Sequence, residues 1–304
     1  MLRRSLLYLS EQPWLRRWME NSPVSRKLTS RFVAGRTLGD GIGILQKLSA
    51  ENILATLDYL GENVSSLEDA AASTNSYLAA LAEIERAALP ATVSIKLTQL
   101  GLNFSEQACR ANIRTLVERA RVIGTRVEID MESSAYTDRT LRLVTELHSN
   151  FEGHVRAVIQ AYLYRSETDI RMLSARGIPV RLCKGAYQES ISVAFARKSE
   201  VDANYVKLMK LLLAEGAHPA IAGHDENIVR EAIRHIKEQN ISPDRYEFQM
   251  LYGIRRDLQR QLIGGGFRLR LYVPYGDAWY PYFMRRLAER PANVLFLAKN
   301  LLRN

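Results

Sequence analysis

The stretch ATVSIKLTQLGLNFSEQACRANIRTLVERARVIGTRVEIDME, residues 91–132, contains one complete strand–helix–strand pattern. Its first part, 91–101, and its last, 126–132, are short and rich in β-branched and apolar residues, which predicts two strands. Residues 105–124 between them have helical periodicity, with Ser105 suited to cap the start of the helix and Gly124 to close its end. Strands joined by a helix in this way can pair in parallel.

The same pattern recurs along the chain. Helical segments such as 67–88 and 225–240 separate strand-like runs at 53–61, 91–101, 126–132, 155–163, 178–187, 218–225, 246–251 and 267–276. This spacing is close to the roughly thirty residues per unit of a (β/α)8 barrel. A doubly wound open sheet would usually carry a glycine-rich nucleotide loop after an early strand, and GGGF at 264–267 follows a helix instead. We therefore predict an α/β barrel over residues 51–304.

Residues 1–50 are expected to form a separate N-terminal segment of short helices. Pro13, Pro23 and the glycine cluster at 39–43 would punctuate it. Its first 28 residues are basic and amphipathic, but Glu11 and Glu20 interrupt them and no small-residue cleavage site follows an apolar core. We expect docked helices of the mature fold rather than a targeting peptide. No run reaches the roughly eighteen uncharged apolar residues of a membrane span.

The composition is that of a globular protein, with 304 residues, 47% hydrophobic and 25% charged. The net charge of +9 could indicate nucleic acid, but the basic residues are scattered among acids and form no basic tail, so we expect no nucleic-acid partner. Two cysteines, Cys109 and Cys183, are too few for a disulfide framework. They favour a reducing, intracellular setting and hence a cytoplasmic protein.

Polar residues gather where the predicted strands end, which is where such barrels carry their chemistry. The strand interiors are expected to be apolar, so these groups need partners when they are buried. They are Lys96, Gln99, Asp130, Glu132, Gln160, Tyr162, Arg181, Lys184, Tyr187, His224, Asp225, Tyr272 and Tyr275. Together they are typical of a small-molecule site.

Several of these residues can be interpreted in two ways. Lys96 and Asp130 fit either a structural ion pair across neighbouring strands or a functional pair. His224 has no second histidine or cysteine at metal spacing, so no metal site is expected. Lys184 would suit a Schiff-base aldolase if burial depressed its pKa, whereas the same cationic groups would suit a flavin enzyme. The residues alone leave both enzymes open.

The stretch WYPYFMRRLAER, residues 279–290, predicts a helix with two stripes. One is apolar, and the other carries Tyr282, Arg285, Arg286 and Glu289. The second stripe could be a solvated face in which Glu289 pairs with Arg285. It could also face a site.

Six motifs resemble the bacterial monofunctional proline dehydrogenases and the related domain of the bifunctional proline utilisation proteins. They are LDYLGE, SIKLTQLGL, VRLCKGAYQES, EFQMLYGI, LRLYVPYG and WYPYFMRRLAERPANVLF. The resemblance runs from about residue 53 to the end of the chain. It implies a distorted (β/α)8 barrel with N-terminal helices, non-covalently bound FAD, and a final helix that lies over the barrel mouth.

The resemblance also implies roles for individual residues. Lys96, Arg285 and Arg286 would bind a substrate carboxylate, Asp130 would hold the cationic groups, and Glu289 would orient one arginine. The residues that would line the proline ring are Tyr187, Leu251, Tyr272 and Tyr282. Arg181 would lie beside flavin N5, and the other FAD contacts would be Gln160, Lys184, Gly185, Ala186, Tyr187 and His224.

The implied reaction is oxidation of L-proline to Δ1-pyrroline-5-carboxylate, the first step of proline catabolism to glutamate. Hydride would pass from proline C5 to flavin N5, and a membrane quinone would take the electrons. The basic surface and N-terminal helices would then favour peripheral contact with the inner membrane. No aldehyde dehydrogenase segment follows, so a separate pyrroline-5-carboxylate dehydrogenase is expected for the next step.

Overall fold

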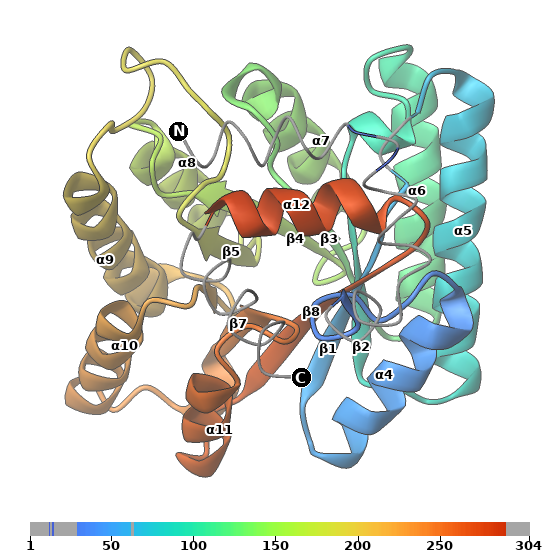
Figure 1. The fold of residues 1–304 in the computed structure, drawn as a ribbon. Helices are drawn as coiled ribbons and strands as arrows, with labels where there is room; N and C mark the ends of the chain where they lie inside the picture. The colour runs from blue at the N-terminus through green and yellow to red at the C-terminus, as the bar shows by residue number, and fades with distance from the viewer. Residues whose placement is uncertain (1–11, 13, 15–28, 62–63, 290–304) are drawn as a thin grey trace.

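The computed structural model describes residues 12, 14, 29–61 and 64–289, without the side chains of 285–289. Eight parallel strands pair in sequence order and close into a barrel, as predicted (Figure 1). The strands are β1 (Leu54–Tyr59), β2 (Ala91–Ile95), β3 (Val127–Ile129), β4 (Val155–Gln160), β5 (Val180–Cys183), β6 (Ala220–Ala222), β7 (Glu247–Leu251) and β8 (Leu269–Tyr275). Closure pairs β1 with β8, Leu54 opposite Arg270 and Tyr59 opposite Tyr275.

A helix follows each of the eight strands, and one more, α4 (Leu38–Ala50), precedes β1. The predicted cap is present: Ser105 accepts a hydrogen bond from the Ala108 amide at the start of α6, and Asp225 accepts one from the Asn227 amide at the start of α10. The eight helices are α5 (Leu67–Arg86), α6 (Glu106–Val122), α7 (Thr137–Asn150), α8 (Ser166–Ala175), α9 (Lys198–Glu215), α10 (Glu226–Glu238), α11 (Arg256–Gly264) and α12 (Trp279–Glu289). Short 3-10 turns lie at Thr98–Leu100, Ser134–Tyr136 and Pro243–Arg245. None of the described helices is long and apolar enough to cross a membrane.

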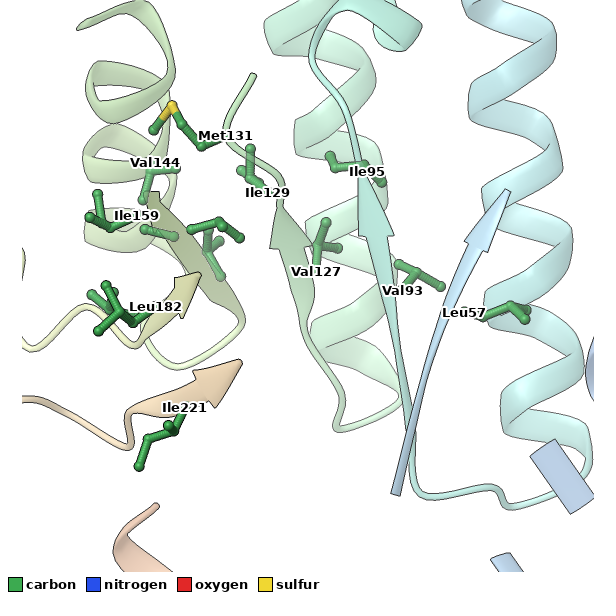
Figure 2. Close-up of a cluster of buried hydrophobic side chains, with 14 of the residues drawn as sticks. Leu57, Val93, Ile95, Val127, Ile129, Met131, Val144, Ile159, Leu182 and Ile221 are labelled. Carbon is green, nitrogen blue, oxygen red and sulfur yellow. The ribbon is translucent and has the colours of Figure 1, made fainter. Parts of the chain in front are cut away.

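The hydrophobic core is a layer between the strands and the surrounding helices. Strand residues such as Leu57, Val93 and Ile129 share one buried cluster with helix residues such as Leu81 and Leu116. Figure 2 shows part of this layer, with apolar side chains from β1 to β6 and Val144 from α7. Since successive strand residues point to opposite faces, the neighbours of these apolar residues point into the barrel.

The barrel interior is polar, so the predicted apolar strand interiors are wrong. The inward set contains buried acids, arginines and hydroxyls: Thr56, Thr92, Ser94, Glu128, Arg156, Arg181, Glu247, Gln249 and Arg270. Alternation along the strand explains it. In VEI of β3, for example, Val127 and Ile129 join the outer apolar layer while Glu128 points inward.

The glycine cluster at 39–43 was expected to interrupt the N-terminal helices, and instead it lies inside α4. Thr37 and Asp40 form a capping box that starts this helix. A Cβ on Gly41 would come within 3.1 Å of Leu57 and 3.4 Å of Tyr275, so this glycine lets α4 approach the barrel closely. The helix packs against β1 and β8 and adds to the main core.

Helix α12 follows β8 but does not join the outer ring, where α4 already covers β8 and β1. Its buried residues Trp279, Tyr280 and Phe283 cluster with Val33 and with Leu60, which directly follows β1. The Ala278 amide also donates to the Leu60 carbonyl at 3.2 Å. The helix thus starts at the carboxyl ends of β1 and β8, and Figure 1 shows it crossing the barrel, as predicted for a helix over the mouth.

Candidate functional site

Lys96 lies between two carboxylates at the carboxyl ends of β1 to β3. Its Nζ is 3.6 Å from Asp58 Oδ1 and 3.9 Å from Asp130 Oδ2. The ion pair considered for Lys96 and Asp130 is thus present but long, and Asp58 was missing from the predicted set. Alternation places Asp58 on the same inward face as Thr56, and this signal could have revealed it. Lys96 thus presents its ammonium at the mouth between two carboxylates.

Asp130 is the centre of the hydrogen bonds at the mouth. Its Oδ1 accepts from Ser94 Oγ and from Arg181 Nη1, both at 2.8 Å, and its Oδ2 accepts from Tyr272 Oη at 2.8 Å. The Arg181 guanidinium carbon also lies 5.4 Å from the centre of the Tyr272 ring. Arg181 therefore points into the barrel, which decides against an outward orientation. Four elements hold these groups rigidly together.

Glu128, inside the barrel, holds Arg181 in place through hydrogen bonds. Its Oε2 accepts from Arg181 Nη2 at 2.6 Å and from Arg181 Nε at 3.0 Å, while its Oε1 accepts from Arg156 Nη1 at 3.2 Å. Burial by itself would raise the pKa of Glu128, but Arg181, Arg156 and Arg270 outweigh it and lower the pKa to about 2. The carboxylate is therefore charged at neutral pH despite complete burial.

Glu247 extends the network toward the amino end of the barrel. It accepts from Arg156 Nη1 at 2.5 Å and from Arg270 Nε at 2.9 Å. Burial opposes its ionisation, and Arg270 and Arg156 still hold its pKa well below the ordinary value. Three acids thus face three arginines in this interior network: Glu128, Asp130 and Glu247 against Arg156, Arg181 and Arg270.

These depressed pKa values predict acid lability. A carboxylate with a lower pKa in the folded state adds stability above its unfolded pKa, which is about 4.3 for glutamate, and loses that contribution as pH falls toward the folded value. We expect the urea midpoint to be nearly constant from about pH 7 to 5.5 and to drop steeply between about pH 4.5 and 2.5 as Glu128 and Glu247 take up protons. Chemical denaturation over that range checks this. An unchanged midpoint at about pH 3 would contradict it.

The ends of β4 to β7 carry a second group of predicted residues. Gln160 Nε2 donates to the Glu132 carbonyl at 2.7 Å, and His224 Nε2 accepts from the Leu251 amide at 2.9 Å, which ties β6 to β7. Gly185 has a φ of +106°, and a Cβ there would come within 2.3 Å of the Tyr162 ring. Only glycine fits this turn. The following residues, Ala186 and Tyr187, are exposed.

Lys184 belongs to an ionic cluster. Its Nζ lies 2.5 Å from Asp202 and 2.9 Å from Asp225, and Lys198 contacts the same two acids. The amine of a Schiff-base lysine must be free to attack a carbonyl, whereas Lys184 Nζ is engaged by two carboxylates. The side chain is 28% exposed, so its charge is accessible from the mouth. This environment favours an anion-binding role over an aldolase nucleophile.

The structure brings some of the predicted site residues together and leaves others undescribed. Lys96, Asp130, Arg181 and Tyr272 form one contiguous group, whereas Gln160, Lys184, Gly185, His224 and Leu251 lie along the ends of β4 to β7. Tyr282 is buried in α12 beside the mouth. The side chains of Arg285, Arg286 and Glu289 lie outside the described residues. The charged residues of the site and the interior network that sequence reasoning missed are Asp58, Glu128, Arg156, Glu247 and Arg270.

Comparison with known proteins gives a consistent result. A family model described as "Proline dehydrogenase" matches residues 42–299. The chain is 38% identical to "Proline dehydrogenase 1" of Bacillus subtilis over 303 residues, covering 100% of both chains. It is 36% identical to "Proline dehydrogenase" of Deinococcus radiodurans over 305 residues, covering 99% of this chain and 98% of that protein.

Among solved structures, the chain is similar to proline utilization A from Bdellovibrio bacteriovorus inactivated by N-propargylglycine. The TM-score is 0.81 at 28% sequence identity, and the match covers 86% of this chain. It covers 32% of that much longer protein. The chain therefore matches the Bacillus and Deinococcus relatives over nearly their full length. It matches about a third of the length of proline utilization A.

Proposed function

Because the chain belongs to the proline dehydrogenase family and so is an enzyme of proline catabolism, we propose that it oxidises L-proline to Δ1-pyrroline-5-carboxylate with non-covalently bound FAD. The observation that carries the proposal is the group at the barrel mouth, where Asp130 joins Arg181 and Tyr272 beside Lys96. It provides fixed positive charge next to an aromatic surface, which suits both a flavin and an amino-acid carboxylate.

The residues at the ends of β4 to β6 fit a flavin dinucleotide. Arg181 is held by Glu128 and Asp130, so its guanidinium has a fixed position from which to contact the reactive edge of the ring. Lys184 offers an accessible ammonium for the diphosphate, and the turn at Gly185 brings backbone close. We propose Gln160, Arg181, Lys184, Gly185, Ala186, Tyr187 and His224 as the FAD contacts. Bound FAD would supply the hydride acceptor, at N5.

The substrate would bind on the other side of the mouth. Lys96 presents a cation between Asp58 and Asp130, and we propose that it meets the proline carboxylate together with Arg285 and Arg286 from α12, with Glu289 orienting one of the two arginines. Tyr187, Leu251, Tyr272 and Tyr282 would enclose the ring. The ammonium of proline must lose a proton before hydride leaves C5, and the enclosed site would keep water away from that carbon.

We also propose the partners that the reaction requires. A membrane quinone would take the electrons, which places the cytoplasmic enzyme at the inner membrane as a peripheral protein during turnover. A net charge of +9 favours an anionic membrane surface. A separate pyrroline-5-carboxylate dehydrogenase would consume the product.

The direct test is product analysis. Purified protein is incubated with L-proline and a soluble quinone, and the product is identified by mass spectrometry as the compound that has lost two hydrogens. D-proline serves as the control because its carboxylate would point away from Lys96. Absence of this product with L-proline, or trapping of a carbonyl substrate on Lys184 by borohydride, would refute the proposal.

Lys96 and Asp130 are predicted to respond differently to substitution. Lys96→Met should fold nearly normally, because Asp130 keeps its hydrogen bonds from Ser94, Arg181 and Tyr272, and it should raise the KM for L-proline by about tenfold or more. Asp130→Asn should lower both the melting temperature and turnover, because Arg181 and Tyr272 lose their shared acceptor.

Thermal melts and steady-state kinetics on both variants check this, with Lys207→Met as the control. Lys207 is an exposed lysine of α9, and it is paired with Glu167 on the neighbouring helix α8. A proline ester, which lacks the carboxylate charge, should discriminate little between the original protein and Lys96→Met. A large loss of melting temperature in Lys96→Met with unchanged kinetics would show that the lysine is purely structural.

A further inference from the structure

A cavity of about 570 Å³ lies at the amino end of the barrel, opposite to the mouth. Arg126 lines it and directly precedes β3, whereas Asp130 of the proposed active site directly follows that strand. The apolar part of the lining comes from Leu54, Ile84 and Leu89. A cavity of this size, with a mixed lining and a convergent charge, is in the range of small organic ligands, which is roughly 300–1,000 Å³.

Arg126 is the unusual residue of this cavity. Its Nη1 is buried, and within the part of the chain that the structure describes it has no hydrogen-bond partner. Burial, with a smaller contribution from Arg156, lowers the pKa of Arg126 to about 10. The guanidinium is therefore still charged at neutral pH, although it is partly removed from water. A buried donor on a charged group needs an acceptor.

The neighbouring charges do not supply that acceptor. Arg270, which also lines the cavity, donates to Glu247 and to the Ala55 carbonyl. Glu85 is paired with Arg119 on the adjacent helix. Among the described residues, Glu128 and Glu247 are already hydrogen-bonded to Arg156, Arg181 and Arg270, so Arg126 adds a further cation beside these pairs.

Two histidines, His154 and His218, lie near this end of the barrel. His154 Nδ1 contacts the Thr125 carbonyl at 2.6 Å, which commits that nitrogen to the backbone. Burial and the nearby Arg156 lower the pKa of His218, so it is neutral at pH 7. The charge of the Arg126 guanidinium could be matched by a monoanion in the cavity.

We propose that this cavity is a binding site for a small organic monocarboxylate. The carboxylate would pair with the guanidinium of Arg126, which lines the cavity, and the apolar body would lie against Leu54, Ile84 and Leu89. Guanidinium and carboxylate are geometrically matched for paired hydrogen bonds. A bare inorganic anion would leave the apolar lining without a partner, so the organic body is part of the recognition.

Benzoate is the probe for the test, and calorimetric titration of the full chain is the measurement. Benzoate should bind to the original protein, whereas benzyl alcohol, which lacks the charge, should not. Arg126→Gln should weaken the binding by about tenfold or more, because a charge-assisted hydrogen bond is lost. Ile123→Trp, which fills the cavity while keeping Arg126, should abolish it.

Two control variants test whether benzoate binds in this cavity rather than elsewhere on the protein. Arg245→Gln removes an exposed arginine before β7, at the same end of the barrel, and should leave binding unchanged. Lys96→Met alters the mouth and should also leave it unchanged. The proposal is overturned if benzoate does not bind, if its binding depends on Lys96 rather than Arg126, or if Arg126→Gln binds it equally well. Equal binding of inorganic phosphate would overturn the organic class of ligand.

Discussion

Replacing Glu128 with glutamine is expected to lower the free energy of unfolding by about 3–5 kcal/mol. The carboxylate is fully buried and receives hydrogen bonds from Arg181 and Arg156. Glutamine keeps the shape but removes the charge, so two buried guanidinium groups would be left with too few anions. Breaking a buried pair costs far more than the pair's net contribution, because the surviving charge has no water to return to.

Urea denaturation at neutral pH measures this loss. The matched control is Glu118→Gln on α6, because Glu118 also pairs with an arginine, Arg114 at 2.8 Å, but both side chains are exposed. That substitution should change the free energy of unfolding by less than about 1 kcal/mol. A similar small effect at both positions would mean that the interior network adds little to stability.

Replacing Arg285 or Arg286 with methionine should lower kcat/KM for L-proline by about 30- to 1,000-fold. This range corresponds to the roughly 2–4 kcal/mol lost when a charged hydrogen bond to a carboxylate is removed. The expectation rests on α12, which starts at the carboxyl ends of β1 and β8 with its apolar side buried against Leu60. Flavin content should persist, because the proposed cofactor contacts come from the strand ends.

Arg260→Met on α11 is the control, since Arg260 is exposed and its Nε donates to a backbone carbonyl of its own helix. Steady-state kinetics and the flavin-to-protein ratio are compared for the three variants. Near-normal efficiency of both Arg285→Met and Arg286→Met would favour the alternative interpretation, in which the stripe on α12 is a solvated face.

The barrel could be predicted from sequence because its signal is local and repeated. Strand-like runs alternate with helical segments, and several of these segments open on a capping residue, such as Ser105 or Asp225, that the structure confirms. The polar residues at the strand ends could be found for the same reason. Once the fold is known, Lys96, Asp130 and Arg181 must come to one end of the barrel.

The polar interior could not be predicted with the same reasoning. The strands are three to seven residues long, so a run such as VEI is too short to show whether the acid points inward. The direction of Glu128 depends on residues of other strands, because a buried carboxylate inside the barrel is stable only when Arg156 and Arg181 pair with it. The role of the glycines at 39–43 was mispredicted for a related reason. Gly41 is needed because α4 packs closely against Leu57 and Tyr275, and these contacts cannot be seen from the local sequence.

The central claim is that this chain oxidises L-proline with a flavin, and one absorbance spectrum tests it most directly. The purified protein should be yellow, and anaerobic addition of L-proline should bleach the flavin bands, whereas a sugar phosphate should not. A colourless protein that binds no added FAD, or a bound flavin that L-proline leaves oxidised, would contradict the account.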